Sequence, residues 1–125
     1  MKLDLDTATH LYTIRSYQPG MITVNDEILT QSFILLPDQL IRHWAPQSFG
    51  QVTRQHFMDL AHLEPELVLF GTGARLQFPA PELSLVLLHK NIGLEAMDTA
   101  AACRSYNILM AEGRRAAAAL LMIDV

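Results

Sequence analysis

The chain has 125 residues, half of them hydrophobic and only 18% charged, with a formal net charge of −4. This length is typical of one compact domain, and we predict a single domain over residues 1–125. The nine Lys and Arg residues are scattered, with one adjacent pair at Arg114-Arg115, so the basic stripe of a nucleic-acid binder is missing. A mean hydropathy of +0.19 predicts more apolar surface than one small core hides, which favours a protein partner or a homo-oligomer.

The amino terminus and the single cysteine predict where the protein works. Residues 1–6 hold two acids and no apolar stretch, which is not typical of a signal peptide. The longest apolar run, residues 116–123, is shorter than the ~20 residues that a membrane span needs. Because Cys103 is the only cysteine, no internal disulfide forms, as in proteins of a reducing compartment. We therefore predict a cytoplasmic protein that is not an integral membrane protein.

The first half of the chain predicts strands, then one helix. Residues 11–17 alternate as in a strand, and residues 21–24 and 28–36 flank an Asn25-Asp26-Glu27 turn, which predicts a hairpin. Residues 40–50 predict an irregular loop that carries Trp44. A helix is expected to begin after Thr53, a good N-cap, and to stop at Pro65.

The second half alternates strands and helices. Residues 67–70 predict a buried strand, residues 82–91 a helix ended by Gly93, and residues 94–97 a short strand. A second helix runs from a cap at Asp98 or Thr99 to Glu112, and a last strand covers residues 115–123. This order implies parallel strands joined by right-handed crossovers. We predict an α/β fold: a single three-layer domain with a mixed β-sheet, an N-terminal hairpin and helices packed on the sheet.

A polar cluster at the junction before the last helix is the first candidate site. It comprises Glu95, Asp98, Thr99, Arg104 and Asn107. Free N–H groups at a helix start can bind an anion, which makes a ligand site chemically feasible. Asp and Thr are also the commonest helix caps, and the acid opposes a phosphate, so the alternative is a capped helix with a structural polar network.

The last helix has distinct faces. Ala102, Cys103, Tyr106, Leu109 and Met110 form one stripe, so we expect a buried, unreactive Cys103 thiol and a Tyr106 hydroxyl that finds a partner. Ile108 falls on the outer face with Arg104, where it is either stray surface or part of an interface.

Trp44 is the second candidate interface residue. It lies in the loop over residues 40–50, where it either covers a pocket or plugs the edge of the core, and a lone Trp usually anchors a long loop.

Several familiar chemistries find no motif here. Gly71-Thr72-Gly73 follows a strand as a phosphate loop would, but Leu76, Pro79 and Pro81 break the dinucleotide fingerprint and a tight turn remains. The five histidines form no pair with metal-ligand spacing, and no Gly-x-Ser-x-Gly elbow is present. We predict no catalytic residue, no metal site and no cofactor.

The carboxyl-terminal third carries a family resemblance. Its motifs are Gly93-Leu94-Glu95-Ala96-Met97-Asp98-Thr99, Ala102-Cys103-Arg104-Ser105-Tyr106-Asn107 and Glu112-Gly113-Arg114. They resemble a family of small proteins of unassigned chemistry, which includes the mitochondrial assembly factor three of NADH:ubiquinone oxidoreductase (complex I), an adipogenesis-associated protein and bacterial stand-alone members. Members usually have Thr in place of Ser105. The resemblance implies a three-layer α/β domain, and the lack of an Arg-rich leader makes this chain look like a bacterial member.

Two functions follow from these patterns. The first is a non-catalytic protein-binding domain, which assists the assembly of a membrane or respiratory complex as the resemblance implies. The alternative is a small-molecule or anion-binding protein, or an enzyme, which uses the region of Glu95, Thr99, Arg104 and Asn107. A ligand site needs these side chains to converge on a cleft, whereas a partner surface needs an exposed apolar patch.

Overall fold

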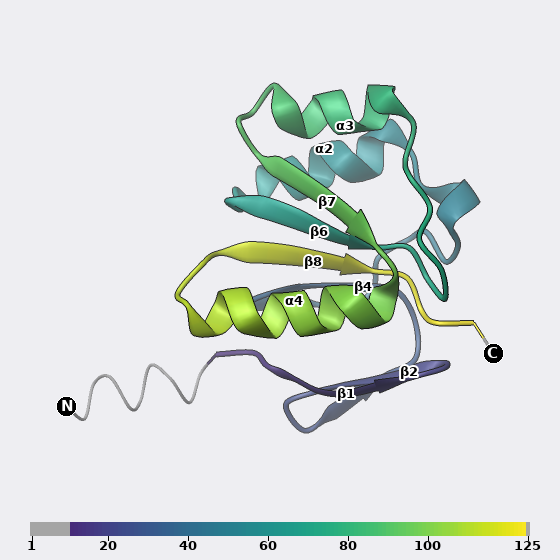
Figure 1. Cartoon of the computed structure of the whole chain (residues 1–125), viewed down its shortest axis with the longest axis vertical. Helices are drawn as coiled ribbons and strands as arrows, with labels where there is room; N and C mark the ends of the chain where they lie inside the picture. The colour runs from purple at the N-terminus through teal and green to yellow at the C-terminus, as the bar shows by residue number, and fades with distance from the viewer. Residues whose placement is uncertain (1–10, 125) are drawn as a thin grey trace.

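A computed structural model describes residues 11–124 of the chain, so the predicted absence of a signal peptide at residues 1–6 lies outside the described residues. The described part is a layered α/β structure with two β-sheets (Figure 1). Its elements are β1 (Ile14–Gln18), β2 (Met21–Val24), β3 (Glu27–Leu29), β4 (Phe33–Leu36), β5 (Gln39–Ile41), the short 3-10 helix η1 (Phe49–Gln51), α2 (Arg54–His62), β6 (Leu67–Gly71), α3 (Pro81–Leu88), β7 (Gly93–Met97), α4 (Thr99–Ala111) and β8 (Ala116–Leu120).

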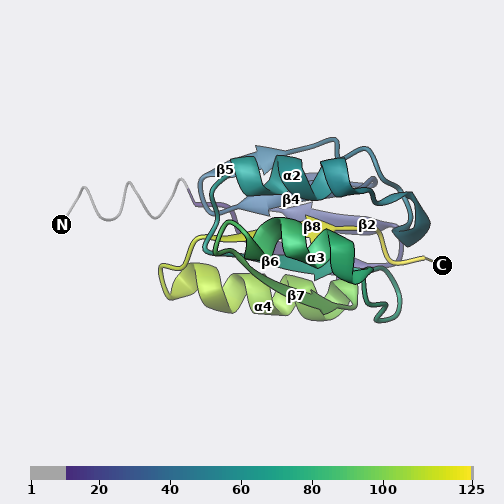
Figure 2. The same ribbon diagram turned by 90° about the horizontal axis from the view of Figure 1, so that it is seen from above.

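The main sheet is mixed, as the sequence predicts. Its five strands lie in the order β5-β4-β8-β6-β7, in which β8, β6 and β7 are parallel and β4 and β5 are antiparallel to their neighbours. Helices α2 and α3 lie on one face of this sheet, and α4 lies on the other (Figures 1 and 2). The three-stranded antiparallel sheet β1-β2-β3 lies on the same side as α4. The predicted α/β class with helices packed on a mixed sheet is confirmed.

The central strand β8 is made almost entirely of alanine. Alanine favours helix, but residues 116–120 are fully buried between β4 and β6 and pair with both. Ala116 and Ala118 face the core on the α4 side, whereas Ala117 and Ala119 face the core under α2 and α3. Burial on both faces therefore overrides the helix propensity of this segment.

The hairpin is confirmed, but the strand predicted over residues 28–36 is wrong. Asn25 takes a left-handed φ of 50° in the turn between β2 and β3, a conformation that Asn tolerates. After Leu29 the chain leaves the small sheet, and β4 begins at Phe33 in the main sheet. Between them Ser32 is fully buried. Its backbone N–H donates to the Gln47 side chain, and its carbonyl accepts from the backbone N–H of Trp44. A continuous run of strand-forming residues thus hides a change of sheet.

The boundary after α3 also differs from the prediction. The helix ends at Leu88 instead of residue 91, and Gly93 is the first residue of β7 instead of a helix terminator. Asn91 takes the left-handed conformation, with φ 60°, that stops the helix. The Thr53 cap of α2 is confirmed, because its side chain and that of His56 form a reciprocal capping box.

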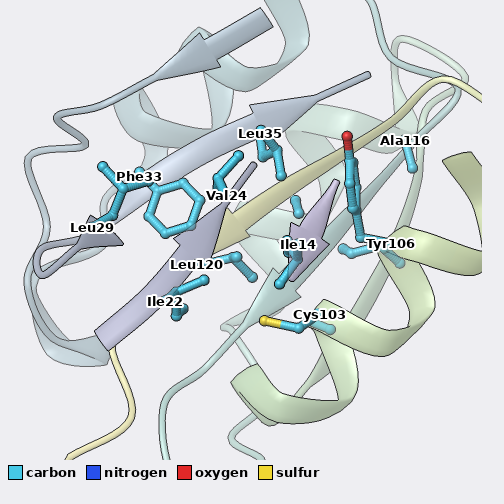
Figure 3. Packing of buried hydrophobic residues seen from close by; sticks show 13 residues of the cluster. Ile14, Ile22, Val24, Leu29, Phe33, Leu35, Cys103, Tyr106, Ala116 and Leu120 are labelled. Atoms are coloured by element: carbon cyan, nitrogen blue, oxygen red, sulfur yellow. The ribbon is translucent and has the colours of Figure 1, made fainter. Parts of the chain in front are cut away.

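The core has one cluster on each face of the main sheet. The cluster on the α4 side joins the small sheet to the main sheet. It includes Cys103 and Tyr106 of α4 and Ile14 and Ile22 of the small sheet, and Figure 3 shows the Cys103 sulfur directed into it. The other cluster lies under α2 and α3 and includes Phe57, Leu60, Phe70 and Leu87. Within the described residues, no helix is long and apolar enough to cross a membrane.

Candidate functional site

Asp98 begins α4 as its N-cap. Its carboxylate accepts a hydrogen bond of 2.9 Å from the Ala101 N–H, which settles the choice between Asp98 and Thr99. The carboxylate therefore takes up a free N–H group of this helix start and places a negative charge there. An anion bound at this helix start would be repelled by the Asp98 carboxylate and would find fewer free backbone N–H groups to bind.

Thr99 has a different role from the predicted cap. It is fully buried, and its hydroxyl accepts from the Gly73 N–H at 2.9 Å and donates to the Leu121 carbonyl at 2.7 Å. Three segments meet at this one hydroxyl: the loop after β6, the start of α4 and the chain just after β8. Gly71 lies against it, since a Cβ atom there would come within 2.9 Å of the Thr99 hydroxyl oxygen and 2.8 Å of a Leu120 methyl group. The Thr99 hydroxyl thus connects three segments inside the core, and the residue exposes no surface to a ligand.

Asn107 connects α4 to the small sheet. Its side-chain oxygen accepts from the Ile14 N–H at 3.0 Å, and its amide nitrogen donates to the Ile14 carbonyl at 2.8 Å. The amide therefore acts as a neighbouring strand would at the edge of β1. The preceding residue, Tyr106, donates from its hydroxyl to the Tyr12 carbonyl at 2.8 Å, so the hydroxyl finds a hydrogen-bond partner as predicted.

Arg104 and Glu95 do not converge. Arg104 is exposed, donates to the Tyr17 hydroxyl at 3.1 Å and lies 6.0 Å from the centre of the Tyr17 ring. This hydrogen bond raises the pKa of the guanidinium further above its usual range. Glu95 is exposed in the middle of β7, and the hydrogen bonds and ion pairs found in residues 11–124 do not connect it to Arg104.

Cys103 lies inside the core. Only 1% of it is exposed, and burial raises the pKa of the thiol to about 12. Burial also raises the pKa of the Tyr106 hydroxyl. A thiol with this pKa stays protonated at neutral pH, which matches the predicted unreactive cysteine and gives no nucleophile.

Trp44 fills space in the core beneath α2. It is 4% exposed, and its ring meets those of Phe70 and His56 edge to face at 6.1 Å each. Its indole nitrogen is buried and has no hydrogen-bond partner among the described residues. This packing matches the plug that the sequence favours over the lid. Of the two predicted interface residues, Trp44 is buried and Ile108 is 59% exposed.

The sequence analysis missed the main apolar surface. Six large hydrophobic residues are exposed in the described chain, and four of them, Leu76, Phe78, Leu85 and Leu88, lie in the connection from β6 to β7. We call these four residues the α3 surface. Helix α3 is leucine-rich around its circumference but buries only Leu87 completely. The leucines around the whole circumference of α3 were the available signal for this surface. A helix that packs on a sheet buries only the side that faces the sheet, so leucines on its other sides stay exposed.

The predicted polar cluster forms no metal site in residues 11–124, and its residues do not line the cavity at the carboxyl ends of β6 and β8. In residues 11–124, no group of three or more His, Cys, Asp or Glu side chains is placed to hold a metal ion. A cavity of about 220 Å³ lies beyond the carboxyl ends of β6 and β8, with Gln47, Thr72, Gln77 and Asp124 among its lining residues. None of the five residues of the predicted cluster lines it. The cluster therefore holds Asp98, Thr99 and Asn107 in structural contacts and leaves Glu95 and Arg104 separate.

Similarity to known proteins identifies the family of this chain. The family of proteins of unknown function DUF498/DUF598 matches residues 14–121. The chain belongs to this family. The bovine NADH dehydrogenase [ubiquinone] 1 alpha subcomplex assembly factor 3 is 33% identical over 110 residues, which cover 86% of this chain but only 59% of the bovine protein. The predicted resemblance to a family with a complex I assembly factor is confirmed.

Solved structures of family members share the same fold. A protein from Bordetella parapertussis is 41% identical and superposes with a TM-score of 0.86, covering 92% of this chain and 98% of its own. A protein from Xanthomonas campestris is 45% identical, with a TM-score of 0.80 and coverage of 89% and 84%. The described fold therefore agrees with experimental structures of bacterial relatives.

Proposed function

We propose that this protein is a non-catalytic, protein-binding domain that assists the assembly of a respiratory membrane complex. The similarity to the bovine assembly factor over 86% of the chain is the observation that carries this function. The matched region is 59% of that relative, so the proposal concerns the role of the shared domain. The proposed place of action is the cytoplasm, a reducing compartment that fits the unpaired thiol of Cys103.

The geometry supports binding over catalysis. Thr99 and Asn107 direct their polar groups to backbone atoms of this chain, and Cys103 is a buried thiol with a raised pKa. These groups are not presented to a substrate, so the alternative ligand site in this region loses two of its four members. The α3 surface, by contrast, exposes apolar side chains of the kind found in protein interfaces.

Deletion of the gene in the native host tests the assembly role. Membranes are separated by native electrophoresis, and NADH-dependent quinone reduction is measured in the same samples. We expect the intact complex to fall and partial complexes to accumulate, with recovery on re-expression of the wild-type chain. Normal levels of the intact complex and of its activity in the deletion strain would refute the assembly role.

The α3 surface provides a matched pair of rescue variants. Phe78→Ser removes an exposed apolar side chain, 75% exposed, without disturbing the core. Arg75→Ser changes an exposed polar residue of the same connection. If the surface contacts an assembly partner, Phe78→Ser restores less of the complex than Arg75→Ser at equal protein level.

A further inference from the structure

Strand β7 leaves one side of the main sheet open. It is the last strand in the order β5-β4-β8-β6-β7 and pairs only with β6 within the described residues. The Gly93 N–H donates to the backbone carbonyl of Glu66, and the Met97 carbonyl accepts from the Thr72 N–H. The odd-numbered residues of β7 therefore direct their backbone groups toward β6. Because these directions alternate along a strand, Leu94 and Ala96 direct their N–H and C=O groups outward. An extended chain can pair with these four groups.

The two edges of the sheet differ. The opposite edge strand, β5, has only three residues, and Arg42 just after it is held by Glu27 of the small sheet at 2.7 Å. Strand β7 has five residues, contains no proline and pairs with β6 without a register shift. Natural proteins usually protect such an edge by shortening, bulges, proline or charge. Glu95, at the centre of β7, is the only one of these devices present.

Glu95 decides which occupant fits the edge. In an antiparallel pair of two copies centred on β7, Glu95 of each copy stands opposite Glu95 of the other, and like charges directly opposite are destabilising. Each copy also carries a formal net charge of −4. A second copy is therefore disfavoured. A strand with a lysine or arginine opposite Glu95 gains a favourable cross-strand pair instead.

The flanking side chains add an apolar requirement. Leu94 packs into the cluster under α2 and α3, whereas Met97 packs into the cluster on the α4 side. By strand alternation, Ala96 shares the α3 side with Leu94, and Glu95 shares the α4 side with Met97. Helix α3 contacts β7 and carries part of the exposed α3 surface. A strand added to β7 thus places alternate residues on an apolar side and on a side that carries Glu95.

We infer that β7 is a docking edge for an extended segment of another protein, with a basic residue opposite Glu95 flanked by apolar residues on the α3 side. This edge deepens the proposed assembly function and depends on it for its biological meaning. The segment adds a sixth strand to the main sheet. Backbone hydrogen bonds supply most of the pairing, and Glu95 supplies the preference for a cationic partner.

Two synthetic peptides test the edge on the full chain labelled with nitrogen-15. Both are capped nine-residue peptides, one with alternating valine and lysine and the other with alternating valine and glutamate. NMR titration gives the dissociation constants, and amide hydrogen exchange locates the bound segment. We expect the lysine peptide to bind more tightly and to protect the Leu94 and Ala96 amides.

Charge reversal provides the decisive variant. Glu95→Lys is expected to shift the ratio of the two dissociation constants roughly tenfold toward the glutamate peptide, since an attractive cross-strand pair becomes a repulsive one. Asp26→Lys is the matched control, because it changes the net charge equally but lies in the exposed turn of the small sheet. It is expected to leave the preference for the lysine peptide and the protected amides unchanged.

Other outcomes overturn the docking edge. They are no binding of either peptide, protection at amides away from β7, or the same shift for Asp26→Lys as for Glu95→Lys. Protection of Leu94 and Ala96 that grows with protein concentration in the absence of peptide assigns the edge to a second copy instead. If the peptides bind as expected but the deletion strain assembles its complex normally, the docking edge stands and the assembly function fails.

Discussion

The two helices of the parallel half, α3 and α4, meet the sheet in opposite ways. Helix α4 lies over the middle of the main sheet and against β1, and it buries Ala102, Cys103 and Tyr106. Helix α3 covers the end of the sheet near β7, fully buries only Leu87 and leaves Leu85 and Leu88 exposed. The helix with more polar residues is therefore the one that is more firmly integrated into the fold.

This difference separates stability from binding. The polar side chains of α4, Thr99 and Asn107, are joined to the backbone of three other segments, so changing them weakens the fold itself. The apolar side chains of the α3 surface are 45–75% exposed, and we propose that they contact another protein. The contacts with a partner are thus expected at the α3 surface and at the β7 edge with Glu95, and not at Thr99 and Asn107.

The inner face of α4 gives the largest expected effect, at Cys103. Burial raises the pKa of its thiol from 9.0 to about 12, so the native thiolate fraction at pH 8 is roughly 1000-fold below that of the unfolded chain. We expect iodoacetamide to label the native protein at least that much more slowly than the protein in urea. Rapid native labelling would contradict the buried thiol.

The same shift gives a pH dependence of stability. Between pH 9 and pH 12 the unfolded thiol is ionised while the folded thiol is still protonated. The folded state then binds more protons, so this contribution to stability is complete below pH 9 and is lost as the pH rises toward 12. Cys103→Ala removes this part of the alkaline loss, which urea titrations of both proteins at pH 8 and pH 10.5 measure.

Thr99→Val tests the two buried hydrogen bonds of the Thr99 hydroxyl at the start of α4. The substitution keeps the shape but leaves the Gly73 N–H and the Leu121 carbonyl without their partner. Two buried groups without hydrogen bonds reduce the free energy of unfolding by about 2–4 kcal/mol. Urea denaturation measures the loss, with Thr30→Val, an exposed site, as the control. A loss of less than about 1 kcal/mol would show that other groups replace the hydroxyl.

Asn107→Ala tests the connection between α4 and the small sheet. The loss of both bonds to Ile14 lowers the free energy of unfolding by roughly 1–2 kcal/mol and speeds hydrogen exchange at the Ile14 amide. Asn107→Asp is the informative companion, since a carboxylate still accepts from the Ile14 N–H but repels the Ile14 carbonyl. Unchanged exchange at Ile14 in both variants would mean that β1 is held by its other contacts.

Local signals in the sequence predicted most of the elements. The Asn25 turn and the Thr53 cap follow from turn chemistry and capping, which act over a few residues. The last strand was predicted over residues 115–123 from its place in the order of strands and helices, although its alanines favour helix. The strand predicted over residues 28–36 was wrong because strand propensity does not record a change of sheet. Gly93 was wrongly predicted to terminate α3, because the left-handed residue that follows this helix is Asn91, two positions before Gly93.

The roles of the polar cluster depended on pairings that no local pattern contains. Asn107 meets Ile14 across 93 positions, and Thr99 meets Leu121 across 22, so their partners became evident only in three dimensions. The sequence did offer Asp98 and Thr99 as alternative caps of the helix, beside the alternative of an anion site. The leucine-rich circumference of α3 was a signal of exposed leucines, but a leucine-rich helix is usually taken as core, so the α3 surface was missed.

The smallest expected change in stability belongs to the α3 surface. Leu88→Gln replaces a side chain that is 63% exposed, so we expect the free energy of unfolding to change by less than about 0.5 kcal/mol. Leu87→Gln, one residue earlier but fully buried, is the matched control and is expected to cost about 2–4 kcal/mol, since it places an amide in the core beneath α3. Urea denaturation of both variants measures the contrast. An equal loss in both would mean that Leu88 contributes to the fold, and the apolar excess of α3 would then need no partner to explain it.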